Sequence, residues 1–131
     1  MSRIDAWVAP AAKQQLLRQS MDLGPLGPEE VEIQVEHCGI CHSDLSVLNN
    51  EWGNSLYPAV LGHEAVGRIV TVGSAAKGLA VGQRVGVGWN AGSCLHCRSC
   101  RAGNLHLCAQ AQATIIGHTG GFASHLRSHW M

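Results

Sequence analysis

The sequence predicts a mostly β chain with short helices, and two observations support this. Apolar residues alternate with polar ones more often than they recur at helical spacing. Glycine is abundant, at 16 of 131 residues, whereas proline contributes only four, which is typical of strands joined by many turns. No apolar stretch approaches the roughly 18 residues that a membrane span needs. The length suits one domain, which we expect to cover residues 1–131.

The clearest strand is expected over residues 31–36, with the sequence VEIQVE. Its alternation places Val31, Ile33 and Val35 on one face and three polar side chains on the other. The glycines and prolines of residues 23–30, LGPLGPEE, predict a turn that leads into this strand.

The remaining elements are less strongly marked. A short helix is expected over residues 43–48, beginning near His42 or Ser43 and followed by Gly53. Alternating segments predict further strands over 65–72, 84–87 and 121–127.

The chain is formally neutral, but its charges are unevenly distributed. Residues 1–64 hold all nine acidic residues and three basic ones, while residues 65–131 hold six basic residues and no acidic one. Six cations spread along the second half, without interleaved aromatic residues, are a weak signal for nucleic acid. We therefore expect neither a nucleic-acid partner nor a membrane partner.

The N-terminal sequence MSRIDAWVAP carries charged residues with no apolar run behind them, unlike a secretory signal. We accordingly expect a cytoplasmic location. In such a reducing compartment, thiols bind metals or do chemistry more often than they form disulfides.

Four of the six cysteines lie in the segment CLHCRSCRAGNLHLC, as Cys94, Cys97, Cys100 and Cys108. Four thiolates at this spacing are typical of a tetrahedral structural zinc site. Metal binding is worth roughly 10–16 kcal/mol in small zinc peptides, more than a polar loop gains from burial. We therefore expect a zinc lobe over about residues 89–110, in which Arg98 and Arg101 offset the negative charge of the thiolates.

Other uses of these cysteines fit less well. The first three match the start of a bacterial ferredoxin motif, but the fourth follows seven residues later, and Ala109 occupies the place of the motif's proline. Disulfides between cysteines so close in sequence are strained. An iron–sulfur carrier is therefore disfavoured, whereas a zinc-stabilised protein-interaction module without catalysis remains an alternative.

A second cluster occupies residues 37–64, HCGICHSDLSVLNNEWGNSLYPAVLGHE. Cys41 and His63 are sulfur and nitrogen ligands of the kind that hold a catalytic zinc. From these residues alone, a core cysteine and a surface histidine explain the pair better. Cys38 and Cys41 also have the spacing of a redox pair, but no βαβ pattern surrounds them.

Three motifs in order, CGICHSDL, YPAVLGHE and the four-cysteine segment, resemble the zinc-containing medium-chain alcohol dehydrogenases. The resemblance runs from about residue 31 to 127 and concerns their N-terminal GroES-like domain. The strings NNEWG and VGWNAGSC are similar to the cinnamyl-alcohol-dehydrogenase and bacterial aldehyde-reductase branch. The resemblance implies a GroES-like β-barrel with short helices and a four-cysteine zinc lobe.

The resemblance also implies two metal sites. Cys41 and His63 become catalytic-zinc ligands, and Glu64 becomes the carboxylate that can replace water as a resting ligand. Asp44 is expected to orient His63. The structural-zinc ligands implied are Cys94, Cys97, Cys100 and Cys108.

Further roles follow from the same resemblance. Ser43 matches the hydroxyl that relays a proton between substrate and solvent, and His42 matches the basic residue that reaches the coenzyme pyrophosphate. Trp52 is expected to line the substrate pocket. Ser46 departs from the pattern, because many relatives carry there a histidine that ends the proton relay.

The implied reaction is the oxidation of alcohols or reduction of aldehydes with NAD(P)H, in which zinc polarises the alcohol or carbonyl oxygen. Family members continue through a Rossmann coenzyme domain, and no G-x-G-x-x-G occurs in this sequence. The family's third protein ligand to the catalytic zinc also lies beyond residue 131. We therefore expect this chain alone to be inactive, to bind NAD(P) poorly, and to self-associate through apolar surface around Trp52 and Trp89.

Overall fold

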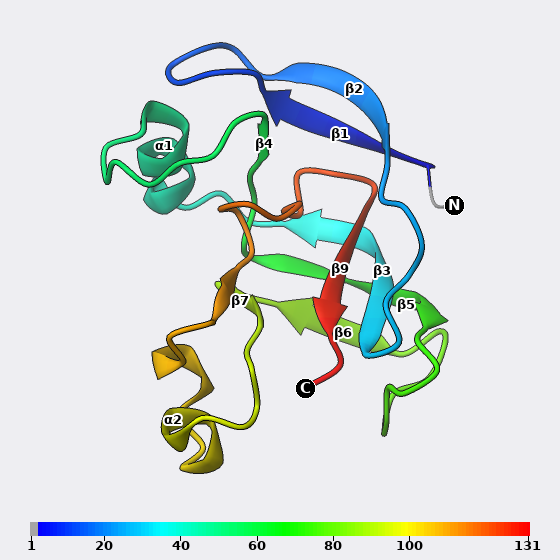
Figure 1. Ribbon diagram of the computed structural model, residues 1–131. Coiled ribbons are helices and arrows are strands. Elements are labelled where there is room, and N and C mark those ends of the chain that lie inside the picture. The colour runs from blue at the N-terminus through cyan, green and yellow to red at the C-terminus, as the bar shows by residue number, and fades with distance from the viewer. Residues whose placement is uncertain (1–2) are drawn as a thin grey trace.

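Two antiparallel sheets form the body of the protein, and a two-stranded ladder leads to the cysteine-rich segment (Figure 1). The computed structural model describes residues 3–131. The strand orders are β2–β1–β4, β6–β5–β3–β9 and β7–β8. In chain order the elements are β1 (Arg3–Ala9), β2 (Leu17–Asp22), β3 (Glu30–Cys38), α1 (His42–Asn49), β4 (Ala59–Val60), β5 (Ala65–Val72), β6 (Arg84–Val87), β7 (Asn90–Gly92), α2 (Arg98–Arg101), the 3₁₀ turn η1 (Leu105–Leu107), β8 (Gln112–Ala113) and β9 (His125–His129).

The sequence pattern predicted none of the three strands of the first sheet, which are β1, β2 and the two-residue β4. β1 alternates as a strand should, with Ile4, Ala6 and Val8 buried. β2 pairs with it antiparallel from Arg3↔Asp22 to Val8↔Leu17 but buries none of its own residues. A strand without a buried face shows no alternation of apolar and polar residues. Its place in the sheet is determined by pairing with its neighbour.

The second sheet is built around β3, which confirms the predicted strand and extends it at both ends. Val31 and Ile33 are buried and Val35 is half-buried, as the alternation predicts. Glu32, expected on a polar face, is buried instead. The reason lies on β9, where the Arg127 guanidinium donates to Glu32 Oε2 from Nε at 3.0 Å and Nη2 at 2.9 Å.

Three other predicted elements are present with small differences. β5 and β6 have the predicted bounds, and α1 extends one residue beyond the predicted helix at each end. The last strand was predicted over 121–127, whereas β9 begins only at His125. Residues 122–124 instead bridge the two sheets, because Trp7 N donates to Phe122 O at 2.9 Å and Val35 N donates to Ser124 O at 2.9 Å.

The apolar core lies in separate clusters, one of which positions the motifs of residues 37–64. Val47 of α1 packs in that cluster with Leu61 and Ile115, all at most 2% exposed. Burial of Val47 and Leu61 together brings α1 next to the segment that carries His63. Among residues 3–131, no helix has the length and hydrophobicity needed to cross a bilayer.

Candidate metal centres

Cys41, His63 and Glu64 come together as the sequence motifs imply. Their ligand atoms all lie within 4.8 Å of one another. Cys41 is half-buried and caps the N-terminus of α1, His63 is buried, and Glu64 is exposed. A thiolate, an imidazole and a carboxylate at this separation form a donor set that suits zinc.

Asp44 organises this site. Its Oδ1 accepts from His63 Nδ1 at 3.1 Å and from Gly62 N at 2.9 Å, and its Oδ2 accepts from Cys41 N at 3.0 Å. Since a carboxylate accepts, His63 Nδ1 carries the proton, and its Nε2 lone pair is left for a metal. One buried carboxylate therefore orients the imidazole of one ligand and the backbone of another.

Glu64 reaches the site because Gly39 has no side chain. The carboxylate of Glu64 lies against Gly39, where a Cβ atom would overlap with Glu64 Oε2. The backbones are also joined, since Gly39 N donates to Glu64 O at 3.0 Å. A side chain at position 39 would therefore displace the Glu64 carboxylate from this place.

The other predicted residues lie around this centre. His42 is exposed and Ser43 half-buried, both in the first turn of α1. Trp52 follows α1 and is 49% exposed. Ser46 is buried, and its hydroxyl donates to Glu51 Oε2 at 2.8 Å, which lowers the pKa of that exposed carboxyl. These positions are compatible with the implied roles, which stay predictions.

Trp89 is a residue of this centre whose role sequence reasoning did not identify. Its indole meets the His63 imidazole edge to face, with ring centroids 5.1 Å apart. It also contacts Trp52, with centroids 5.9 Å apart. The sequence offers no signal for these contacts, because Trp89 lies 26 positions after His63 along the printed chain.

The cysteine lobe forms a second centre. It projects from the body at the end away from β1 and β2 (Figure 1). Its four thiol sulfurs lie within 4.8 Å of one another, and those of Cys94 and Cys100 are 3.9 Å apart. Zinc–sulfur bonds of about 2.3 Å at tetrahedral angles place sulfurs about 3.8 Å apart. The geometry therefore fits a zinc ion, and all six cysteines of the chain are free thiols.

Backbone N–H groups point at the lobe sulfurs. Cys97 N donates to Cys94 Sγ at 3.3 Å, Cys100 N to Cys97 Sγ at 3.5 Å, and Gln110 N to Cys108 Sγ at 3.3 Å. Such donors favour the thiolate over the thiol. The backbone N–H groups of His96 and Cys97 lower the pKa of Cys94 to about 6.

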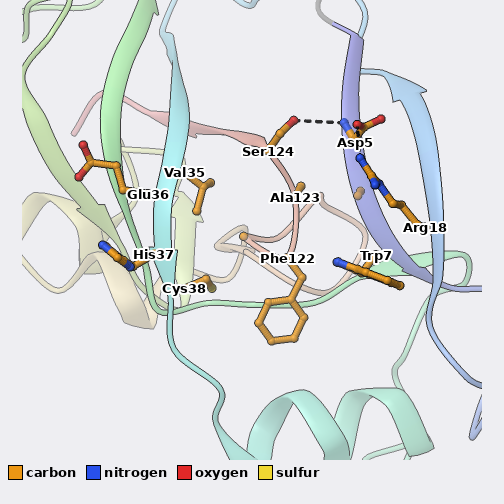
Figure 2. A pocket seen from close by; sticks show the side chains of 12 residues that line it. Asp5, Trp7, Arg18, Val35, Glu36, His37, Cys38, Phe122, Ala123 and Ser124 are labelled. Carbon is orange, nitrogen blue, oxygen red and sulfur yellow. Dashed lines mark hydrogen bonds and ion pairs between the residues drawn. The ribbon is translucent and has the colours of Figure 1, made fainter.

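A cavity of about 470 Å³ opens elsewhere, between β1 and β3 (Figure 2). Trp7, Val35 and Phe122 supply its apolar lining, and the charged side chains of Asp5 and Arg18 also line it. Figure 2 shows the bridging segment 122–124 between the two strands, held by the hydrogen bond from Asp5 N to Ser124 Oγ at 3.1 Å. Neither metal centre contributes a ligand to this cavity.

Comparison with known proteins shows the family of the chain. Residues 27–130 match the alcohol dehydrogenase GroES-like domain. The chain is 49% identical over 125 residues to aldehyde reductase AdhA of Synechocystis sp., covering 95% of this chain and 37% of that protein. The chain therefore belongs to the family of alcohol dehydrogenases with a GroES-like domain.

Solved structures show the same fold. A cinnamyl alcohol dehydrogenase from Sorghum bicolor superposes with a TM-score of 0.89 at 36% identity, covering 98% of this chain and 39% of that one. The cinnamyl alcohol dehydrogenase of Helicobacter pylori complexed with NADP(H) gives a TM-score of 0.90 at 25% identity, covering 98% and 40%. The predicted GroES-like β fold is thus confirmed, and the chain spans less than half the length of these proteins.

Proposed function

We propose that the chain is the zinc-binding part of an NAD(P)-dependent alcohol dehydrogenase or aldehyde reductase. The observation that carries the proposal is Asp44, which holds His63 at 3.1 Å and the Cys41 amide at 3.0 Å beside the Glu64 carboxylate. A module that only bound a protein partner would have no need of a buried carboxylate aimed at two metal donors. The catalytic-zinc ligands proposed are Cys41, His63 and Glu64.

Bound zinc would supply Lewis-acid polarisation of an alcohol or carbonyl oxygen. The residues of this chain would prepare and surround that site. Asp44 keeps the proton on His63 Nδ1, so that Nε2 stays a donor. Trp52 and Trp89, which contact each other, would cover the substrate and exclude water.

Proton transfer to solvent is assigned to hydroxyl groups on α1. Ser43 would exchange a proton with the substrate oxygen, because it lies in the first turn beside Cys41. Ser46 stands where many relatives carry a histidine, and its hydroxyl donates to the exposed Glu51. The Ser46 hydroxyl can pass a proton through water but cannot hold one at neutral pH, so the outer step of the relay differs from that of these relatives.

The coenzyme and the location complete the proposal. His42, exposed at the start of α1, would meet a coenzyme pyrophosphate. Residues 1–131 alone would bind NAD(P) poorly, since they hold no glycine-rich dinucleotide turn. A small alcohol or aldehyde is the proposed substrate class, and the cytoplasm is the proposed location.

Metal content tests the proposal. We expect the purified chain to hold about two zinc ions, because each donor cluster is pre-assembled. A Cys97→Ser variant should lose the lobe zinc, and a Cys41→Ser variant the other. The same preparations should show no oxidation of NADPH with an aldehyde.

Other results would contradict the proposal. One zinc per chain, lost only in the Cys97→Ser variant, would show that the three donors beside Asp44 do not bind metal. Iron in place of zinc would overturn the identification of both centres. Turnover of an aldehyde with NADPH would refute the expected inactivity of the chain alone.

A further inference from the structure

Trp89 stands where the cysteine lobe meets the Cys41, His63 and Glu64 centre. Its indole lies edge to face against the His63 imidazole, with centroids 5.1 Å and planes 83° apart. Ring pairs at this separation and angle attract each other through their quadrupoles. The indole therefore favours one orientation of the imidazole.

The hydrogen bond to Asp44 does not by itself fix the plane of the His63 ring. It bonds His63 at one ring atom, Nδ1, at 3.1 Å. A ring attached at Cγ and hydrogen-bonded only at Nδ1 can still turn about the Cβ–Cγ bond, because this torsion is broad in histidine. An indole packed against the ring restricts this swing, so that Nε2 keeps the direction a metal requires.

The backbone of Trp89 is held by Thr114, which is fully buried. Thr114 N donates to Trp89 O at 2.8 Å, and Thr114 Oγ1 lies 2.9 Å from the same oxygen and 2.6 Å from Gly88 O. Trp89 directly precedes β7 and Thr114 directly follows β8, the two strands from which the lobe projects. We call Gly88, Trp89 and Thr114 the neck clamp.

We propose that Trp89 is a positioning residue for His63, and that the neck clamp makes its position depend on the state of the cysteine lobe. A metal at the four cysteines orders the lobe, and the ordered lobe keeps Trp89 and Thr114, at its two ends, together. Trp89 is then held with its indole against His63. The two metal centres are then coupled, and by linkage each strengthens the other. The coupling rests on the proposed function, because it requires the Cys41 centre to bind a metal. The positioning of His63 by Trp89 does not require a metal there.

The first test follows the His63 ring protons by NMR, in a chain whose lobe is loaded with zinc. The indole gives these protons a ring-current shift, and a His63→Gln variant assigns them. Trp89→Ala should abolish the shift. Thr114→Val, which lacks only the hydroxyl donor, and Cys97→Ser, which empties the lobe, should each reduce it, while Thr114→Ser retains it. Unchanged His63 resonances in Thr114→Val and Cys97→Ser would overturn the dependence on the lobe.

The second test uses a chain that carries zinc at the four cysteines and no metal at the Cys41 centre. Co²⁺ is titrated into it, and the visible absorption of Co²⁺ at the Cys41 centre is followed. Loss of a residue that orients a metal ligand typically lowers metal affinity about 10–100-fold. Trp89→Ala should therefore weaken Co²⁺ binding about 10-fold. Trp89→Phe, which keeps an aromatic ring, should restore most of it. Trp7→Ala, on β1, is the matched control and should bind as the wild type.

Equal Co²⁺ affinity in Trp89→Ala and wild type would overturn the positioning role. A wild-type chain that binds no Co²⁺ outside the lobe would refute the proposed metal centre, and with it the coupling of affinities. The NMR test would still decide whether Trp89 positions His63, so the two failures are distinguishable.

Discussion

Asp44 shows how much one side chain can organise. It sits at the third position of α1, where a carboxylate commonly accepts from the N-cap backbone. Here the N-cap is Cys41, so an ordinary helix-capping bond at 3.0 Å also fixes a metal donor. The other oxygen of the same carboxylate, Oδ1, accepts from His63 Nδ1 at 3.1 Å. Local helix chemistry and metal chemistry thus share one residue.

Asp44→Asn should weaken metal binding at the Cys41 centre by about 10–100-fold, because the amide cannot accept at both ends. Metal at the four cysteines should be much less affected, because the bonds of Asp44 go to Cys41, Gly62 and His63 and not to the lobe. Co²⁺ titration measures both sites, and Asp22→Asn, which removes an exposed carboxylate that accepts from Gly24 N, is the control. Unaltered affinity in Asp44→Asn would show that this carboxylate does not orient the donors.

Among the strands, β3 and β9 are joined by a buried ion pair. Arg127 and Glu32 have side chains 8% and 7% exposed. The same guanidinium donates to the carbonyls of Leu23, Gly24 and Pro25, so it also holds the turn that leads into β3. Loss of the guanidinium would leave a buried carboxylate and three backbone acceptors without this partner.

Arg127→Met should therefore destabilise the chain by about 3–5 kcal/mol, the usual cost of breaking a buried pair by removing one partner. Arg18→Met is the matched control, because Arg18 pairs with Asp5 at the surface, with side chains 69% and 48% exposed. That variant should lose far less stability, because solvent screens an exposed pair. Urea unfolding measures both, and similar losses would contradict the importance of the buried pair.

Taken as one body, the protein leaves apolar side chains exposed near the Cys41 centre. Ile40, next to Cys41, is 84% exposed, and Trp52, which contacts Trp89 beside His63, is 49% exposed. The chain covers 37% of the aldehyde reductase it resembles at 49% identity. Exposed apolar surface of this kind is typical of an interaction site.

We expect the chain to self-associate through this surface. Light scattering should give a mass above the 13.9 kDa of one chain, rising with concentration. Trp52→Ser should reduce the association, while Val81→Ser, at an exposed position after β5, should not. A constant mass of one chain at high concentration would contradict this expectation.

Prediction from sequence succeeded where the signal lies within a few residues. The alternation in 65–72 and 84–87 located β5 and β6, and the cysteine spacing located the lobe. It failed for β2, whose residues are all exposed or half-buried. It also misplaced the start of β9, because Gly121 N donates to Gly62 O and residues 122–124 pair with β1 across the fold.

The sequence alone established the cysteine cluster, because four ligands within fifteen residues meet through short turns whatever the rest of the chain does. It established the buried face of β3 for a similar reason, since alternation follows from backbone geometry. Folding decided the rest. Glu32 is buried because Arg127, 95 residues away, neutralises it, and Trp89 contacts His63 because the neck of the lobe carries it there. Such partners are invisible to local patterns, since a buried charge or an oriented ring depends on groups that only the folded chain brings together.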